Sequence, residues 1–315
     1  MKKCSILISI THELVFLKRS IIQIRKYKHP EIDQEIIITD QSDEKISLEI
    51  KRLYGDQPDI KIIKIPMIDV GYSMDVACKI ATGEYFCSLD GDAFPIHKNW
   101  LFMPISLIEK YGFSFIGNDV GMAQWYKEYG KFICISNYFR VSKTSTMVKI
   151  SEDVGFVRLQ NRHKVNYIPK VNIEQFALVS ENNRTRKNVD SAVIAQWYAD
   201  HIKMGDKLSL PINKMLGATN KQGLYGFCPD DMVFHMSLWR KLEDKEHSKV
   251  NKEDEFGTEY LRWFNLINKE GITDAILEKI LSELKPYVGQ KRHVNGNKLL
   301  PESELNQYIE FLKNA

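Results

Sequence analysis

The sequence contains few cysteines, and their spacing matches no common cysteine framework. There are five in 315 residues, without any CxxC pair: Cys4, Cys78, Cys87, Cys134 and Cys228. An odd and scattered set of this kind does not form the regular ladder of a disulfide-rich domain. Cysteines in apolar segments behave as small hydrophobic side chains. We therefore expect inert thiols and a reducing, cytoplasmic environment.

Long apolar runs and an excess of one charge are also missing. No apolar run approaches the ~18 residues that a membrane-spanning helix needs. The apolar stretch behind Met1–Cys4 is interrupted by His12 and Glu13, which argues against a signal peptide. The 44 basic and 41 acidic residues leave a net charge of +3, and Lys and Arg dominate no segment. The sequence thus predicts no transmembrane segment and no nucleic-acid partner.

Strand and helix signals alternate over the first ninety residues. Short apolar runs of strand length are separated by segments with apolar residues at helical spacing. The predicted strands are Ser5–Ile10, Glu35–Thr39, Ile60–Ile65 and Gly83–Leu89, and the predicted helices are Glu13–Tyr27, Ile46–Leu53 and Gly71–Thr82. This alternation predicts an α/β fold with a mostly parallel sheet and helices on both faces. No GxGxxG follows any of these strands, so the fingerprint of a dehydrogenase is missing.

The later part of the chain is more mixed. Its strand candidates are residues 113–116, 132–135, 165–168 and 232–235. Residues 180–188 have almost no apolar content and predict a loop, after which a helix is expected over Ala192–Lys203. The pattern from Thr258 onward is helical. We expect one main domain followed by a helical C-terminal extension, with bounds 1–257 (halves 1–110 and 111–257) and 258–315.

Polar residues follow three of the predicted strands. In mostly parallel α/β sheets, ligands bind beyond the carboxyl ends of the strands. The segment Ser9–Thr11, the residue Asp40 and the triplet Asp90-Gly91-Asp92 would all emerge at that edge. We therefore expect an active site there.

The triplet Asp90-Gly91-Asp92 suits a divalent cation. Hard cations prefer carboxylate oxygens, and two aspartates on either side of a glycine can reach one ion. Such an ion would neutralise a diphosphate and stabilise it as a leaving group. Because Asp and Gly are also favoured turn residues, the triplet taken alone is better explained as a turn.

The residues around the triplet change that interpretation. The stretch from Gly71 to Asp92, with Ala81-Thr82-Gly83-Glu84-Tyr85 inside it, resembles the segment of family-2-type glycosyltransferases that leads to their DxD motif. The strand Ser5–Thr11 and the strand Glu35–Asp43, which ends in D-x-S-D, are similar to the first two strands of that family. The resemblance implies a GT-A fold, which is a Rossmann-like, mostly parallel sheet flanked by helices.

The resemblance implies a donor site at the carboxyl edge of the sheet. The residues implied in donor binding are Ser9, Thr11, Asp40, Asp75, Asp90 and Gly91. Backbone near Ser9 and Thr11, with the Asp40 carboxylate, would hold the nucleoside, and Asp75 would face the donor. Asp40 also fits a helix cap or a turn. Many family members have Asn or Arg near the position of Asp75, so its role is open between donor binding and structure.

The resemblance also implies a metal site and a general base. The implied metal ligands are Asp90, Asp92 and His235, with Mn²⁺ or Mg²⁺ as the ion. Asp190, which opens a helix closed by Gly205, would take the proton of the acceptor hydroxyl, as direct displacement with inversion requires. Asp190 equally fits a helix N-cap, and His235 equally fits the core. Asp231 is the alternative base, although with Asp230 it is better explained as a turn before a strand.

The implied activity is metal-dependent transfer of a sugar from a nucleotide-sugar donor, with a UDP-sugar favoured, to a glycan or lipid-linked acceptor. The implied setting is surface polysaccharide biosynthesis in the cytoplasm. The basic segment Lys285–His293 could contact the inner face of the membrane, or it could be a solvated linker. Two other functions use a similar sheet. A non-catalytic, nucleotide-sugar-binding scaffold remains an alternative, and a sugar nucleotidylyltransferase is disfavoured because Ser9–Glu13 lacks a glycine-rich basic loop.

Overall fold

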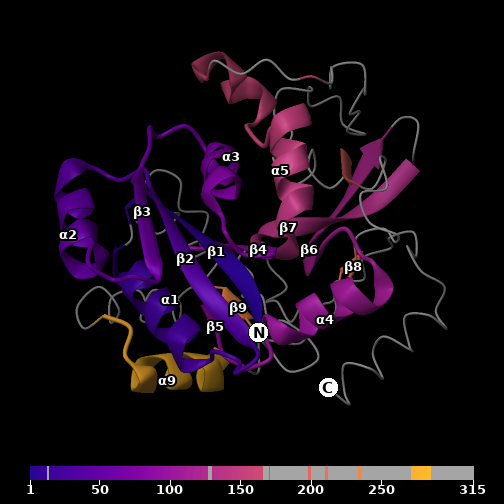
Figure 1. The fold of residues 1–315 in the computed structure, drawn as a ribbon. Helices are drawn as coiled ribbons and strands as arrows, with labels where there is room; N and C mark the ends of the chain where they lie inside the picture. Colours follow the sequence, from indigo (N-terminus) through magenta and orange to yellow (C-terminus); the bar gives the residue numbers. More distant parts are fainter. Residues whose placement is uncertain are drawn as a thin grey trace, which may run out of the picture.

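The structure is a computed structural model that describes residues 1–12, 14–126, 130–165, 170, 198–199, 210–211, 233–235 and 271–284. Its strands are β1 (Lys2–Ile10), β2 (Ile32–Asp40), β3 (Ile60–Lys64), β4 (Tyr85–Asp90), β5 (Ala93–Pro95), β6 (Ile116–Tyr126), β7 (Gly130–Lys143), β8 (Leu210–Pro211) and β9 (Val233–His235). Its helices are α1 (Leu14–Lys26), α2 (Glu44–Tyr54), α3 (Val70–Ile80), α4 (Phe102–Tyr111), α5 (Thr144–Asp153), the 3₁₀ helix η1 (Leu159–Lys164) and α9 (Asp274–Leu284). Figure 1 shows their arrangement.

Within the described residues, seven strands form one sheet in the order β3-β2-β1-β4-β7-β6-β8, and β5 pairs with β9 separately. β1 is parallel to β2 and to β4, and β2 is parallel to β3. β7 is antiparallel to both of its neighbours, β4 and β6, whereas β8 is parallel to β6. The predicted fold class, a mostly parallel sheet flanked by helices, is confirmed.

Helices cover both faces of the sheet (Figure 1). α1, α2 and α4 share one hydrophobic core with the strands, and α3 and α5 share the other. β1 supplies both cores in alternation: Ile6 and Ile8 belong to the first and Leu7 to the second. This division follows from strand geometry, because successive side chains point to opposite faces. It explains why the strands read as continuous apolar runs.

Capping residues define the ends of three helices. The Asp43 side chain accepts a hydrogen bond from the Ile46 N–H at 2.9 Å and caps α2. The Asp69 side chain accepts from the Tyr72 N–H at 3.0 Å and caps α3. Such caps satisfy N–H groups that have no partner inside the helix. α4 ends at Gly112, whose φ of 69° is a left-handed conformation that glycine adopts without strain.

Each strand and helix predicted in the first ninety residues is confirmed, with shifts of a few residues at the ends. The candidates at 132–135 and 232–235 overlap β7 and β9, and the one at 113–116 meets the start of β6. α4 and α5 were not expected from the sequence. The predicted loop at 180–188 lies outside the described residues, as does all but the first residue of the 165–168 candidate. Within the predicted 192–203 helix, residues 198 and 199 are described and are helical.

α9 packs beside α1, at the edge of the molecule shown in yellow in Figure 1. The Arg19 guanidinium of α1 is 4% exposed and pairs with Asp274, the first residue of α9. Lys26 Nζ lies 3.4 Å from the same carboxylate, and Leu277 of α9 is buried. A buried guanidinium needs such a partner, because an unpaired buried charge is costly. α9 is therefore tied to the first helix.

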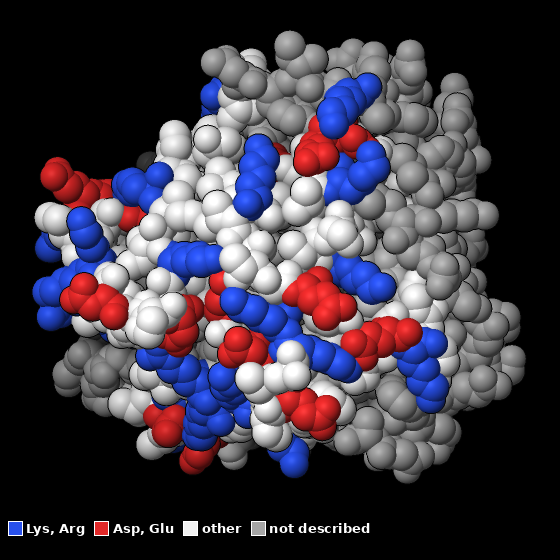
Figure 2. Space-filling view, viewed as in Figure 1, with Lys and Arg blue, Asp and Glu red and all other residues white. Residues whose placement is uncertain are grey.

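Acidic and basic side chains are intermixed over the described part of the face in Figure 2. Elsewhere in the described part of the chain, charged side chains form ion pairs across neighbouring elements. Arg25 and Asp59 approach to 2.8 Å, and Lys18 of α1 lies 3.7 Å from Glu49 of α2. Exposed pairs of this kind contribute little to stability, because solvent screens them. The described part of the face in Figure 2 has no dominant sign of charge.

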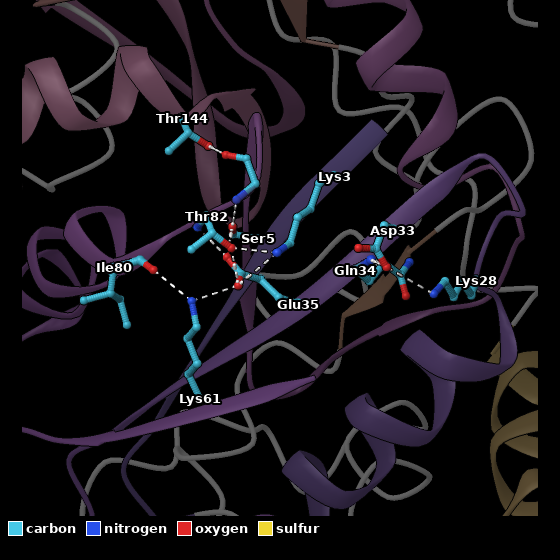
Figure 3. Close-up of polar contacts among 11 residues, drawn as sticks. Lys3, Ser5, Lys28, Asp33, Gln34, Glu35, Lys61, Ile80, Thr82 and Thr144 are labelled. Atoms are coloured by element: carbon cyan, nitrogen blue, oxygen red, sulfur yellow. Dashed lines mark hydrogen bonds and ion pairs between the residues drawn. The ribbon is translucent and has the colours of Figure 1, made fainter. Parts of the chain in front are cut away.

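A buried glutamate anchors the segment that leads into β4 (Figure 3). The Glu35 carboxylate accepts hydrogen bonds from the Thr82 N–H at 2.6 Å, from the Thr82 hydroxyl at 2.7 Å and from the Ser5 hydroxyl. Lys61 Nζ lies 2.9 Å and Lys3 Nζ 3.8 Å from the same group. Burial raises the pKa of Glu35, but the hydrogen bonds from Ser5, Thr82 and Lys61 outweigh it and hold the pKa at about 2.

We expect Glu35→Gln to lower the free energy of unfolding by about 2 kcal/mol at pH 7, because the amide cannot replace a carboxylate that serves several donors. The Glu35 pKa is lower in the fold than the ordinary value of 4.5. Its contribution is therefore present above pH 4.5 and is lost as the pH falls towards 2. Denaturant unfolding at pH 7 and pH 3 measures both effects. The exposed control Glu31→Gln should show neither, and an equal loss at both pH values would contradict the prediction.

Candidate functional site

The carboxyl ends of β1 and β4 form the point at which the order of the strands reverses. The chain runs outward from β1 to β2 and β3, and then returns to place β4 on the other side of β1. Ser9 pairs with Asp90 across β1 and β4, and Ile10 pairs with Asp40 across β1 and β2. Open α/β sheets bind ligands in the crevice at such a point. The structure thus brings Ser9, Asp40 and Asp90 to one edge, as the sequence predicted.

The turn Asp90-Gly91-Asp92 is held from below by α1. The buried Ser20 hydroxyl donates to the Gly91 carbonyl at 2.8 Å and lies 3.1 Å from the Ala93 carbonyl. A Cβ on Gly91 would lie 2.9 Å from Ile10 Cδ1, so the turn packs closely on the end of β1. Asp90 and Asp92 are both partly exposed. The turn therefore presents two carboxylates on a backbone that other residues fix.

His235 lies next to this turn in the pairing of strands. β5 starts directly after Asp92, and Ala93 of β5 pairs with His235 of β9. Ala93 and His235 are 142 positions apart in the sequence, so only the fold brings them together. The sequence placed His235 with the triplet through the family resemblance alone, and the backbone register agrees with that placement.

The residue types in this region are suitable ligands for a divalent cation. Carboxylate oxygens and an imidazole are ligands that Mn²⁺ accepts, and the partly exposed aspartates leave room for further ligands. Among the described side chains, no three His, Cys, Asp or Glu groups lie close enough together to hold a metal ion. The backbone of His235 is described and its side chain is not, so the predicted third ligand is not among these side chains. The carboxylates present fit such an ion, and His235 as its third ligand stays a prediction.

Asp40 is fully buried at the end of β2. One of its oxygens accepts hydrogen bonds from the Ser42 N–H at 2.8 Å and from the Ser42 hydroxyl, with Lys64 Nζ at 3.4 Å. Burial raises the pKa of Asp40, but hydrogen bonding, led by Ser42, and the Lys64 charge outweigh it and lower the pKa. The other oxygen, Oδ2, has no hydrogen-bond partner among the described residues. Asp40 is thus a buried anion at this edge, and its role towards a nucleoside stays a prediction.

Asp75 lies against α5 and the segment behind it. Its carboxylate accepts hydrogen bonds from the Ser151 hydroxyl at 2.7 Å and from the Phe156 N–H at 3.0 Å. It is 7% exposed, and burial raises its pKa to about 6 in spite of these donors. The structure therefore gives Asp75 a role in joining α3 to α5. Its predicted role towards the donor is left as a prediction.

We expect Asp75→Asn to change the pH dependence of stability. Because the folded pKa of Asp75 is about 6 and the ordinary value is 3.8, wild type loses stability as the pH rises through 6. Asparagine has no such titration. The free energy of unfolding of the variant relative to wild type should rise by about 2–3 kcal/mol between pH 4 and pH 7. Denaturant unfolding across that pH range measures this change. A difference in free energy of unfolding that stays constant with pH would refute the raised pKa of Asp75.

Two residues at the same edge were not predicted. Gln41 is 4% exposed and Ser73 of α3 is fully buried. Gln41 Nε2 donates to Ser73 Oγ at 2.8 Å and to Ser9 Oγ at 3.1 Å, and the two hydroxyls lie 2.9 Å apart. Serine and glutamine carry no distinctive signal in a single sequence. The position of Gln41, directly behind Asp40, is the one clue that could have drawn attention to it.

Thr11, the remaining residue predicted for donor binding, directly follows β1 and is partly exposed at the same edge. The predicted base Asp190 and its alternative Asp231 lie outside the described residues. Nearby, Tyr198 is described: it is buried and its hydroxyl donates to Asp153 of α5. The predicted helix behind Asp190 therefore contacts α5 at Tyr198.

Among the described residues, none of the helices has both the length and the apolar character needed to cross a membrane.

Burial raises the pKa of the Cys78 thiol to about 12, which agrees with the expectation of an inert cysteine there. Cys4, Cys78 and Cys87 are free and buried.

No protein-family model and no curated protein matches this chain. Solved structures with a similar fold include the mannosyltransferase PcManGT from Pyrobaculum calidifontis in complex with GDP-Man and Mn²⁺, at 12% identity and a TM-score of 0.40, over 47% of this chain and 46% of that one. S. aureus TarS 1–349 in complex with UDP-GlcNAc is similar at 16% identity and a TM-score of 0.36, over 47% of each chain. GalNAc-T7 with UDP, GalNAc and Mn²⁺ is similar at 15% identity and a TM-score of 0.34, over 46% of this chain and 35% of that one. Each match spans less than half of either chain, and likeness at this level assigns no activity.

Proposed function

We propose that this chain is a metal-dependent glycosyltransferase that moves a sugar from a nucleotide-sugar donor to an acceptor hydroxyl. The observation that carries the proposal is the convergence at the point where the strand order reverses. There Ser9 pairs with Asp90, the turn to Asp92 is fixed by Ser20, and β9 brings His235 beside Ala93. These are the residue types that a nucleoside diphosphate and a divalent cation require, at the edge where such sheets bind ligands.

Asp90, Asp92 and His235 would hold Mn²⁺ or Mg²⁺ in this proposal. When bound, the ion supplies positive charge that stabilises the departing diphosphate. Asp90, with Gly91, also lies beside Ser9 and would contact the donor. Asp40 and the backbone near Ser9 and Thr11 would hold the nucleoside, and Asp75 stays a further candidate for the donor side.

Asp190 is proposed as the general base, with Asp231 as the alternative. A base that takes the acceptor proton during direct attack on the sugar leads to inversion of the anomeric centre. The proposed donor is a UDP-sugar and the proposed acceptor a glycan or a lipid-linked molecule, in surface polysaccharide biosynthesis. The basic segment Lys285–His293 is the proposed point of contact with the cytoplasmic face of a membrane.

A thermal-shift screen tests the donor site. Purified protein is heated with UDP, GDP, CDP, ADP and their sugar derivatives, with and without Mn²⁺. Stabilisation by one nucleoside diphosphate only in the presence of metal is expected, because a ligand that binds the folded state raises its melting temperature. If none of these ligands shifts the melting temperature, the proposal of a donor site fails. Binding without donor hydrolysis or transfer would favour the non-catalytic scaffold.

Asp190→Ala is expected to leave nucleoside diphosphate binding unchanged and to remove sugar transfer, because a base acts in the chemical step and not in donor binding. Calorimetric binding and a transfer assay on the same protein preparation separate the two quantities. Asp231→Ala is the matched variant. Normal transfer by Asp190→Ala, with loss in Asp231→Ala, would move the base to Asp231.

A further inference from the structure

The Gln41 amide is oriented by a hydrogen bond on each side. Its Oε1 atom accepts from the Ile68 N–H at 3.0 Å, in the segment between β3 and α3. The opposite orientation would bring two donors together at Ile68, so the network fixes which atom is nitrogen. Nε2 then donates to both Ser9 and Ser73. Gln41 therefore imposes the same polarity on both hydroxyls: each must accept from it.

The bond between the two hydroxyls also has a direction. Ser73 is fully buried, and the described hydrogen-bond partners of its hydroxyl are Gln41 and Ser9. If Ser9 donated to Ser73, the Ser73 hydrogen would be buried without an acceptor, which costs about 1–3 kcal/mol. Ser73 must therefore donate to Ser9. The buried residue decides the direction of the bond.

The Ser9 hydroxyl can therefore interact with a ligand only as a hydrogen-bond donor. A serine oxygen has two acceptor sites, and those of Ser9 are filled by Gln41 and Ser73. Its own hydrogen has no acceptor among the described residues. Ser9 is partly exposed, at the end of β1 and directly beside Asp90 of β4. The one hydrogen that the cluster leaves over is thus displayed at the edge where the ligand is expected.

We propose that Gln41 and Ser73 are positioning residues that make the Ser9 hydroxyl an obligate hydrogen-bond donor to an acceptor oxygen of the bound nucleoside diphosphate. The inference rests on the proposed function for its ligand and adds the polarity of the contact. A site whose hydroxyl can donate and cannot accept rejects a ligand that presents a donor at that point, because two donors would then face each other.

A double-mutant cycle tests this polarity. Ser9→Ala is made in wild type and in Gln41→Glu, and the Kd of UDP, GDP, CDP and ADP with Mn²⁺ is measured by calorimetry. In wild type, Ser9→Ala should raise the Kd of the bound diphosphate about 5–10-fold, as loss of one hydrogen bond does. A glutamate at 41 accepts where the amide donated, so Ser9 turns inward to donate to it. Ser9→Ala should then change the Kd less than twofold in that background. The added charge repels the ligand equally in both members of that pair and cancels.

Ser9→Thr keeps the hydroxyl and is the matched control, with a Kd expected within about threefold of wild type. If Gln41→Glu does not fold, the double variant Gln41→Met/Ser73→Ala replaces it: Ser9 then loses both donors that fix the direction of its hydroxyl, and Ser9→Ala should cost clearly less than in wild type. An equal cost of Ser9→Ala in all backgrounds would show that Gln41 does not set the polarity and would overturn this inference alone. No binding of any diphosphate to wild type would overturn the proposed function and this inference together.

Discussion

Replacing Asp92 by alanine should abolish the metal-dependent binding of a nucleoside diphosphate while the protein remains folded. The backbone of the turn is held by the Ser20 hydroxyl through the carbonyls of Gly91 and Ala93, so the turn does not depend on the Asp92 carboxylate alone. Asp92 is partly exposed and directly precedes β5, the strand that pairs with β9. Mutating a residue that only hydrogen-bonds to a metal ligand lowers metal affinity about 10–100-fold. Removing a direct ligand should therefore lower it at least about 100-fold.

Calorimetry with UDP and GDP, with and without Mn²⁺, measures this loss. Asp43→Ala is the matched control, because Asp43 is an exposed aspartate at the same edge of the sheet that caps α2. It should lose about 1 kcal/mol of stability through the missing cap and keep its metal-dependent binding. Asp92→Asn, which keeps the shape and removes the charge, should behave like Asp92→Ala. Unchanged metal dependence in Asp92→Ala would place the ion away from this turn.

The first half of the fold could be predicted because its signals are local. The strands β1 to β4 are short apolar runs, and the helices between them carry apolar residues at helical spacing. Once the strands are taken as parallel, their carboxyl ends must share one edge. The prediction that Ser9, Asp40 and Asp90 reach that edge needed only this step, and the observed registers confirm it.

The rest of the sheet depends on pairing between distant segments. β7 enters between β4 and β6 and runs against both, although no local signal in residues 130–143 fixes its neighbours. The hydroxyl cluster is hidden for the same reason. Gln41, Ser73 and Ser9 come from three elements, and their contacts exist only after β1, β2 and α3 have come together.

Part of the motif that carries the family resemblance serves the fold. Thr82 donates to the buried Glu35 (Figure 3). The Gly83 N–H donates to the Ser5 hydroxyl at 2.8 Å. A Cβ on Gly83 would lie 2.6 Å from the Ser5 backbone nitrogen, so a larger residue would force β4 away from β1. These contacts lie before the start of β4, at the opposite end from the Asp90 turn. Thr82 and Gly83 therefore support the strands, and their place in the motif needs no contact with a ligand.

Gly71→Ala should have the largest effect on stability, although Gly71 has an ordinary helical position in the first turn of α3. A Cβ there would lie 2.0 Å from the Phe156 carbonyl oxygen and 2.9 Å from the Val157 nitrogen, and both are backbone atoms. The segment after α5 would have to move away from α3. That movement would break the hydrogen bond from the Phe156 N–H to Asp75. Overpacking costs about 1–3 kcal/mol and each lost hydrogen bond about 1, so we expect a loss of about 4 kcal/mol.

This loss corresponds to a fall of roughly 6 °C in melting temperature for a chain of this size, measurable by circular dichroism or calorimetry. Gly91→Ala is the matched control: its Cβ meets the end of the Ile10 side chain at 2.9 Å, which can rotate, and the Ser9 carbonyl only at 3.4 Å. It should therefore cost much less stability than Gly71→Ala. Equal losses in the two variants would mean that the close contact between α3 and the segment after α5 is not what requires glycine at position 71.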